Sequence, residues 1–286
     1  MLIGEGVSPE NGLPYVDQWT PEGIQRRYLG RLPTPEGHSM MALPGLEAVT
    51  GISPIPRDKI VNMAFESRWT EVPILDQDGQ GACTAYAHAT AAMLVRSRAG
   101  STFQMLSANF LYTLINGGFD GGSNAGDAIQ AMTTTGIALA SVVSGRPIRP
   151  KGVSSAAMAS AARFRLRDSL RLTTIEEVWT CLAFRWPVTI DVQAGNAYNT
   201  DSHGTLAYLG NRNNHEQVLS GEGIRIGPDG KLQFLLRNSW NVTWGQNGFA
   251  WATEQHVLSS QMLFCPRWMI EDPQDPDVIP GLPKVA

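Results

Sequence analysis

The 286-residue sequence lacks most of the features that mark exported, membrane-bound or nucleic-acid-binding proteins. Its first residues, MLIGEGVSPENGLP, show no basic segment followed by an apolar run, and no stretch approaches the ~18 apolar residues that cross a membrane. The formal net charge of −4 gives no broad positive field for a phosphate backbone. We therefore expect no membrane and no nucleic-acid partner, and a location in the cytoplasm or in a particle assembled inside the cell.

Cysteine is scarce as well. The three cysteines, Cys83, Cys181 and Cys265, are too few and too far apart for a disulfide scaffold or a metal cluster. Such spacing suits a reducing compartment, and we expect no metal and no organic cofactor. With 43% hydrophobic and 17% charged residues, the chain has an ordinary globular composition and is long enough for two lobes around a shared core.

Both ends of the chain are rich in proline and glycine. Residues 1–56 contain SPENGLP, RLPTPEG, ALPG and SPIP without a sustained helical or strand period, and residues 271–286 are similar. We expect two extended arms around a domain at 57–270. Apolar side chains would hold the first arm on its own domain or on a neighbouring subunit, as a tether rather than an inhibitory plug. These side chains are Leu13, Tyr15, Trp19, Tyr28, Leu29 and Leu43.

The domain changes character near residue 187. From about 75 to 186 the segments are rich in helix formers and carry helix-capping residues, such as Ser107 before ANFLYTLIN. From about 187 to 268 the segments PVTIDVQ, EQVLSGEGIRI, KLQFLLRNSW and GFAWAT are typical of strands. A helical lobe followed by an antiparallel β lobe predicts an α+β fold, with a site in the groove between the lobes.

Cys83 lies in the stretch DQDGQGACTAYA, at the predicted start of a helix. The unpaired N–H groups and positive dipole of a helix N-terminus favour the thiolate over the thiol, so this position predicts a lowered pKa. The competing interpretation is a buried, inert cysteine, which is common in proteins. A nucleophilic role therefore depends on finding an acid/base partner.

Two of the five histidines could supply that partner. His215, in NRNNHEQVLSGEGI, begins a predicted strand whose edge would face the groove, whereas His203 lies in the polar, turn-like stretch NTDSHGTL. An imidazole that works with a thiolate needs a third group to hold its orientation. Asn238, in LLRNSWNVTWGQNGFAW, ends a predicted strand, and its amide oxygen could accept the imidazole N–H beneath the indole of Trp240.

These stretches resemble the papain family of cysteine peptidases. DQDGQGACTAY is similar to the family pattern D-Q-G-x-C-G-S-C-W-A-F, and NSWNVTWGQNGF is similar to N-S-W-G-x-x-W-G-E-x-G-Y. NHEQVL, LSANFLYTLIN, GGSNAGDAIQAM and PVTIDVQAG also resemble family segments in the family order, over about residues 66–255. His215 follows Cys83 by 132 residues and Asn238 follows it by 155, close to the ~130 to 150 typical of these enzymes.

The resemblance implies a role for each matching position. Cys83 would be the nucleophile, His215 the acid/base and Asn238 the residue that orients it. Gln77 would form the oxyanion hole with the Cys83 N–H, and Trp240 would cover the His–Asn bond. The matching pair of glycines, Gly121 and Gly122, would bind an extended substrate through its backbone.

Three positions depart from the family pattern. Gln80 replaces the cysteine that braces the active-site loop by a disulfide in secreted members, so the resemblance is to a bacterial or viral-like branch without it. Thr84 replaces a tryptophan and Asn241 a glycine, which alters local packing but removes no chemical role.

The expected activity is hydrolysis of peptide or isopeptide bonds in a peptide or protein substrate. The sequence does not distinguish endopeptidase, exopeptidase and isopeptidase activity. The alternative is a papain-fold structural or binding subunit of a larger assembly, such as a virus-like particle, that its two arms would contact.

Overall fold

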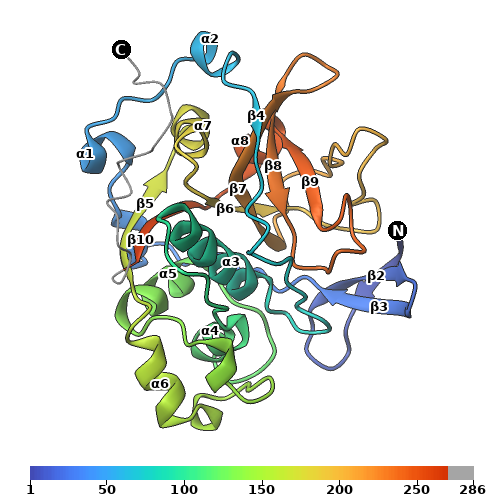
Figure 1. The fold of residues 1–286 in the computed structure, drawn as a ribbon. Coiled ribbons are helices and arrows are strands. Elements are labelled where there is room, and N and C mark those ends of the chain that lie inside the picture. The colour runs from blue at the N-terminus through green and yellow to red at the C-terminus, as the bar shows by residue number, and fades with distance from the viewer. Residues whose placement is uncertain (270–286) are drawn as a thin grey trace.

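The computed structural model describes residues 1–269, and the predicted Pro-rich tail at 271–286 lies outside them. Two lobes lie side by side, with a small sheet formed by the N-terminal residues next to the β lobe (Figure 1). The α+β fold predicted from the sequence is confirmed, with a helical lobe before an antiparallel β lobe.

The helical lobe is built around one buried helix. This helix, α3 (Cys83–Arg98), is rich in alanine, and every side chain from Cys83 to Arg96 is buried. Small side chains allow neighbours to pack on all sides of it, including β7 of the other lobe. Helices α4 (Ala108–Ile115) and α5 (Ala125–Thr134) pack against it. The lobe is completed by α6 (Ser155–Ala161) and the short 3₁₀ turns η1 (Ser39–Ala42), η2 (Ala140–Val142) and η3 (Pro150–Gly152).

Side-chain caps fix where these helices begin, as the sequence predicts. The Ser107 hydroxyl accepts the N–H of Phe110 at the start of α4. Thr174 and Glu177 form a full capping box at the start of α7 (Ile175–Ala183). Because Ala82 has no side chain that could cap α3, that helix begins with its first N–H groups free for other partners.

The β lobe is a seven-stranded antiparallel sheet in the order β5-β10-β6-β7-β8-β9, with β4 also paired to β7. Its strands are β4 (Phe65–Glu66), β5 (Leu166–Leu172), β6 (Val188–Val192), β7 (His215–Ile226), β8 (Leu232–Arg237), β9 (Phe249–Thr253) and β10 (Leu263–Met269). The predicted boundary at 187 is too late, because β5 already pairs with β10 and α7 packs in the core of this lobe. Helix α8 (Glu254–Ser259) follows β9.

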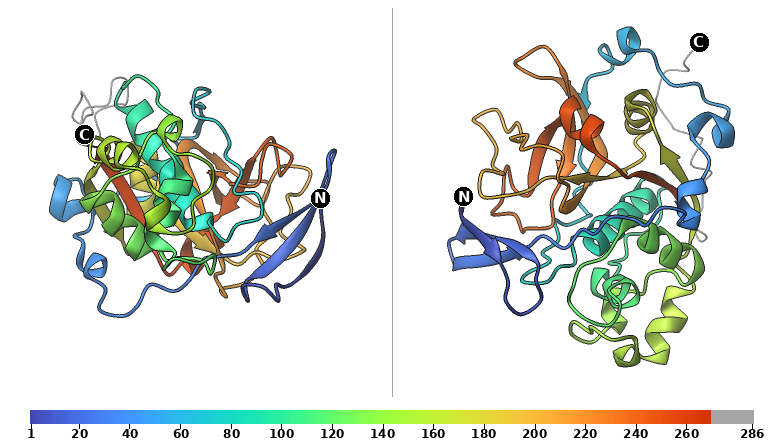
Figure 2. Two further views of the ribbon diagram at one scale, coloured as in Figure 1. Left: turned by 90° about the horizontal axis from the view of Figure 1, so that it is seen from below. Right: turned by 180° about the vertical axis from the view of Figure 1, so that it is seen from behind.

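The extended arm predicted for residues 1–56 is wrong for its first half, which folds into a sheet. Strands β1 (Leu2–Val7), β2 (Pro14–Thr20) and β3 (Gly23–Tyr28) form an antiparallel sheet in sequence order. Seen from behind, the chain after β3 crosses between the two lobes (Figure 2). It then passes the short helices α1 (Leu46–Thr50) and α2 (Arg57–Ile60) on its way to β4.

Candidate active site

Cys83 is the first residue of α3, as predicted, and its side chain is fully buried. The sulfur accepts backbone N–H groups from Glu216, the second residue of β7, and from Gly30, which follows β3. The thiol therefore lies where the start of α3, the start of β7 and the N-terminal segment meet.

His215 and Asn238 are brought together by two neighbouring strands. His215 begins β7, Asn238 follows the end of β8, and the imidazole Nε2 lies 2.9 Å from the amide Oδ1. The backbone N–H of Ser239 donates to the same oxygen at 2.8 Å, which identifies that atom as the acceptor. Nε2 must therefore carry the proton, and the buried Nδ1, which has no hydrogen-bond partner, remains free to act as a base.

Aromatic rings cover this pair. The Trp240 ring lies 4.6 Å from the imidazole of His215, centroid to centroid, and tilts by 31° to it. The Tyr198 ring meets both rings edge-on. His215 and Trp240 have no exposed surface, so water is excluded from the His215–Asn238 bond, which is thereby strengthened.

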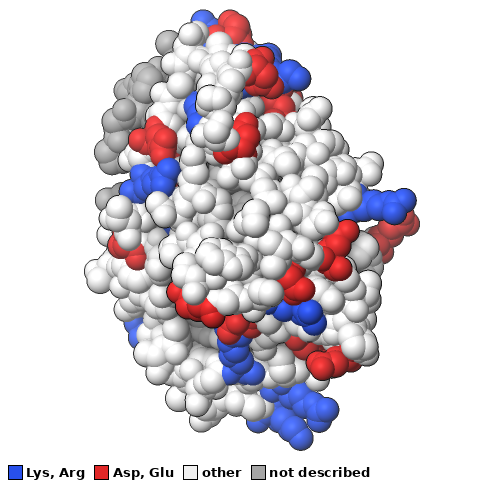
Figure 3. Space-filling model, turned by 90° about the vertical axis from the view of Figure 1, so that its right-hand side faces the viewer, with Lys and Arg blue, Asp and Glu red and all other residues white. Residues whose placement is uncertain are grey.

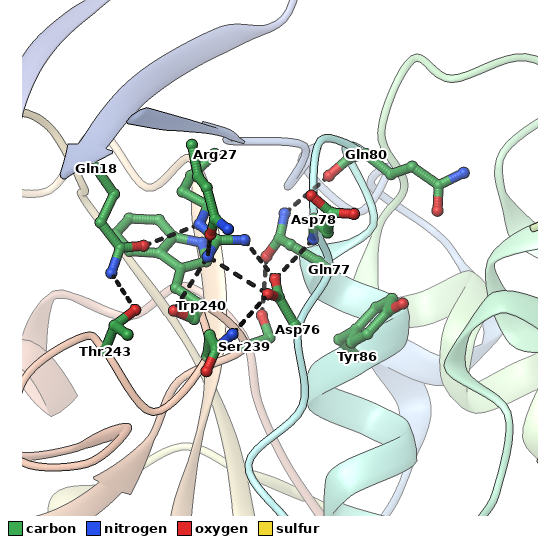
Figure 4. A network of polar contacts seen from close by, with 12 residues as sticks. Gln18, Arg27, Asp76, Gln77, Asp78, Gln80, Tyr86, Ser239, Trp240 and Thr243 are labelled. Atoms are coloured by element: carbon green, nitrogen blue, oxygen red, sulfur yellow. Dashed lines mark hydrogen bonds and ion pairs between the residues drawn. The ribbon is translucent and has the colours of Figure 1, made fainter. Parts of the chain in front are cut away.

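Gln77 has its side-chain amide fixed by three contacts. The Ser239 hydroxyl donates to its Oε1 at 2.8 Å, so the amide nitrogen must face the other way. That nitrogen donates to the carbonyl oxygens of Tyr28 and Gln80, both at 2.8 Å. Figure 4 shows Gln77 beside Gln80 and Ser239. The donor predicted to bind an oxyanion thus already binds a carbonyl oxygen of the N-terminal segment.

The strap, defined here as residues 28–34, runs between the two lobes and bonds to both. The Arg31 N–H donates to the carbonyl of Asn214, the residue before His215, at 3.1 Å. On the helical side, Ser123 N–H donates to the carbonyl of Gly30, and Leu32 N–H donates to the carbonyl of Ser123, each at 2.8 Å. These bonds use only main-chain atoms of the strap and hold it in the way that an edge strand holds an extended peptide.

Gly30 is the point of closest approach between the strap and the active-site loop. A Cβ atom built on Gly30 would lie 1.9 Å from the carbonyl oxygen of Gly81. On the facing side, a Cβ on Gly122, whose φ is +86°, would lie 2.3 Å from the carbonyl oxygen of Gly30. Only glycine therefore fits at Gly30 while the strap is in place.

A buried arginine fastens the N-terminal sheet to the active-site loop. The Arg27 guanidinium, from β3, forms an ion pair with Asp76 and donates to the carbonyl of Trp240 at 3.3 Å (Figure 4). Its side chain is completely buried, and Gln18 accepts from its Nε at 2.9 Å. Removing one partner of a buried pair leaves an uncompensated charge, so this contact fixes the sheet beside Gln77.

Burial by the surrounding chain makes both reactive groups neutral at pH 7. It raises the pKa of the Cys83 thiol to about 11 and lowers the pKa of the His215 imidazole to about 4. The lowered thiol pKa predicted from the helix start is therefore wrong for the closed chain, because desolvation outweighs the hydrogen bonds that the sulfur accepts. Gly30 of the strap contacts the thiol, and nothing in the stretch around Cys83 indicates this contact.

The buried imidazole predicts acid sensitivity of the fold. Unfolded chains protonate histidine near pH 6.5, whereas folded His215 resists protonation until about pH 4, so stability falls as the pH drops through this interval. A His215→Gln chain lacks this loss. We expect the free energy of unfolding of the wild type to fall, relative to that of His215→Gln, by about 1.4 kcal/mol for each pH unit between pH 6.5 and 4. Urea unfolding measures both free energies.

His203→Gln provides the control, since it makes the same substitution at an exposed histidine outside the site. Parallel loss of stability in wild type and His215→Gln would contradict a neutral buried imidazole. At the alkaline end, the folded chain keeps the Cys83 proton up to about pH 11 but the unfolded chain loses it near 9, so stability should also fall above pH 9.

The structure brings some predicted residues to this site and leaves others aside. Gly122 lies against the strap backbone, but the hydrogen bonds to the strap come from Ser123, which the sequence analysis missed. No backbone hydrogen bond joins Gly121 to the strap. His203, the alternative candidate for the acid/base, lies in an exposed loop, as its polar surroundings indicate.

Within residues 1–269, no cluster of three or more His, Cys, Asp or Glu side chains is arranged to hold a metal ion. No helix in this range is long and apolar enough to cross a membrane. On the face shown in Figure 3, cationic and anionic side chains are interspersed rather than gathered by sign.

Two lobes, a cysteine at the start of a buried helix and a histidine–asparagine pair on the facing strands are the architecture of a cysteine peptidase. The model of the papain family cysteine proteases matches residues 63–263, and the chain belongs to this family.

Solved structures show the same fold at low sequence identity. Xylellain, a cysteine protease from Xylella fastidiosa, is similar with a TM-score of 0.65 and 16% identity over 82% of this chain and 94% of xylellain. Digestive procathepsin L 3 of the Tenebrio molitor larval midgut gives 0.60 and 14% over 76% of this chain and 73% of that one. Bromelain from Ananas comosus, in complex with the E64 inhibitor, gives 0.53 and 17% over 68% and 91%. The search of curated proteins found no significant match.

Proposed function

We propose that this chain is a latent cysteine peptidase that hydrolyses peptide bonds through Cys83, His215 and Asn238, with Gln77 in the oxyanion hole. The single observation that carries the proposal is the bond between His215 and Asn238, because it fixes the imidazole tautomer and leaves Nδ1 as a free base. The fold alone would not support activity, since a papain-like fold can serve other purposes.

The chemistry proceeds in two halves. In the open chain, His215 takes the Cys83 proton on Nδ1 and the thiolate attacks the carbonyl carbon of a peptide, while Gln77 and the Cys83 N–H stabilise the oxyanion. The C–N bond then breaks, and the imidazolium protonates the departing amine. A water molecule, deprotonated by His215, next attacks the thioester, and collapse releases the acid and restores the thiol.

The strap supports latency. It places the carbonyl of Tyr28 on the Gln77 donor, and the N–H of Gly30 on the sulfur of Cys83. Both groups that the reaction needs are therefore occupied by the strap. Substrate must displace the strap before the reaction starts.

Selective labelling tests the nucleophile. An epoxide-type cysteine-protease inhibitor should modify Cys83, slowly in the wild-type chain, and leave Cys181 and Cys265 unmodified, because those two thiols are buried away from the His215–Asn238 pair. The measurement is intact mass followed by peptide mapping. Modification of Cys181 or Cys265 as fast as Cys83 would overturn the assignment.

The alternative of a structural subunit in a larger assembly was based on the two Pro-rich arms. Residues 1–34 make the contacts described above with their own domain, so for this part of the chain the arm has a role that needs no assembly. We therefore propose the peptidase.

A further inference from the structure

The side chain of Arg31, in the strap, forms an ion pair with the β lobe. Its Nη2 lies 2.7 Å from Oδ2 of Asp191, and the two side chains are 1% and 0% exposed. Asp191 lies in β6 beside Val192, whose register partner is His215. The strap thus neutralises a buried carboxylate of the β lobe.

The β lobe itself holds the Asp191 carboxylate in place by hydrogen bonds. Its Oδ1 accepts the backbone N–H groups of Gln261 at 2.9 Å and Met262 at 3.0 Å, together with the Ser260 hydroxyl. Its Oδ2 accepts the side-chain amide of Asn213 at 3.1 Å. None of these four donors comes from the strap. The carboxylate is therefore a built feature of the β lobe, for which the strap supplies only the cation.

The hydrogen bonds on either side of the Arg31 side chain run through the main chain of the strap. The Arg31 N–H bonds to Asn214, and the neighbouring groups of Gly30 and Leu32 bond to Ser123, all through main-chain atoms. An extended peptide with glycine at the position of Gly30 could form the same bonds. The side chain that meets Asp191 is what distinguishes one peptide from another at this point.

We propose that Asp191 is the floor of a specificity site for a basic side chain of an extended peptide substrate, and that Arg31 occupies this site in the closed chain. The inference rests on the peptidase proposed above. A substrate that displaces the strap also withdraws Arg31 from a buried carboxylate. A neutral side chain would leave that charge unpaired, whereas a guanidinium or ammonium restores the pair. The site therefore discriminates against neutral peptides, because their binding leaves a buried charge without a partner.

The test measures binding to the full-length chain with the strap displaced and the nucleophile removed, that is, the Cys83→Ala/Gly30→Ala/Arg31→Ala variant. Gly30→Ala forces the strap away from Gly81, and Arg31→Ala removes the internal competitor. The probes are acetyl-Tyr-Leu-Gly-Arg-Leu-Pro-Thr-amide, which copies the strap, and the same peptide with citrulline for arginine. Citrulline keeps the shape of arginine and lacks its charge.

We expect the arginine peptide to bind on the order of 10-fold more tightly or better, since citrulline lacks the positive charge that pairs with the buried carboxylate. Adding Asp191→Asn should abolish the difference. Equal binding of the two peptides, including no measurable binding of either, would overturn the assignment, and this comparison stands even if Asp191→Asn fails to fold. A preference that survives Asp191→Asn would overturn it as well.

The design separates the two proposals. Binding is measured without Cys83, so a failure of Cys83 as nucleophile leaves the arginine preference untouched. Retained preference for the arginine peptide together with no hydrolysis by the Gly30→Ala chain would reject the peptidase and keep the basic-side-chain site. Hydrolysis without any preference for arginine would reject the site alone.

Discussion

Replacing Gly30 with alanine is expected to raise the rate at which Cys83 reacts with the epoxide inhibitor by on the order of 100-fold, since an open minor form commonly holds about 1% of a two-state population. The new Cβ would lie 1.9 Å from the Gly81 carbonyl oxygen, and neither backbone can rotate away as a flexible side chain could. The strap must therefore leave its place between the lobes. The labelling rate of Cys83, followed by mass, measures the opening.

Gly4→Ala is the matched control, because it makes the same substitution in the same N-terminal segment. A Cβ on Gly4 would have the Asp17 carboxylate at 3.7 Å as its nearest neighbour, which is ordinary contact. We expect Gly4→Ala to label at the wild-type rate. A Gly30→Ala chain that stays folded and labels no faster than Gly4→Ala would show that the strap does not limit access to Cys83.

The second large effect concerns the acid/base. In the Gly30→Ala background, His215→Ala should lower kcat for a peptide substrate by on the order of 10⁴-fold, the upper range for loss of a general acid/base. Gln77→Ala should lower kcat by about 10²- to 10³-fold, as removal of one oxyanion donor does. Asn238→Ala should cost less than His215→Ala, because it affects only the orientation of the imidazole.

The three substitutions must be compared in the Gly30→Ala chain and not in the wild-type chain. In the wild-type chain, Gln77→Ala would also remove the hydrogen bond to the carbonyl of Tyr28 and loosen the strap, which would mask part of the loss. Equal kcat for Gly30→Ala with and without Gln77→Ala would remove Gln77 from the oxyanion hole. Full activity after His215→Ala would remove His215 from the reaction.

The sequence predicts the lobes and the candidate site well because both depend on side-chain identity. Cys83 begins its helix and His215 begins its strand at the predicted positions. Asn238 and Trp240 contact His215 as the NSW segment indicates. These residues are recognisable because each has a side chain that few other residues could replace.

The strap could not be predicted in the same way, because its contacts run through the main chain. The N–H and carbonyl groups of Ser123 and Asn214 bind the strap, and every non-proline residue carries such groups. The strands before it could not be predicted either, since the segments LIGEGV, PYVDQWT and GIQRRY are short and proline and glycine lie in or next to them. Arg31 and Asp191 lie 160 residues apart, and nothing local in either segment indicates that they pair.

Hydrolysis of a peptide substrate by three full-length chains tests the central claim most directly: wild type, Gly30→Ala and Gly30→Ala/Cys83→Ala. The substrate carries arginine at the position that matches Arg31. We predict hydrolysis by Gly30→Ala, far slower hydrolysis by wild type, and none when Cys83 is absent. Equal hydrolysis by wild type and Gly30→Ala, or hydrolysis that persists without Cys83, would contradict a Cys83 peptidase held closed by its own N-terminal strap.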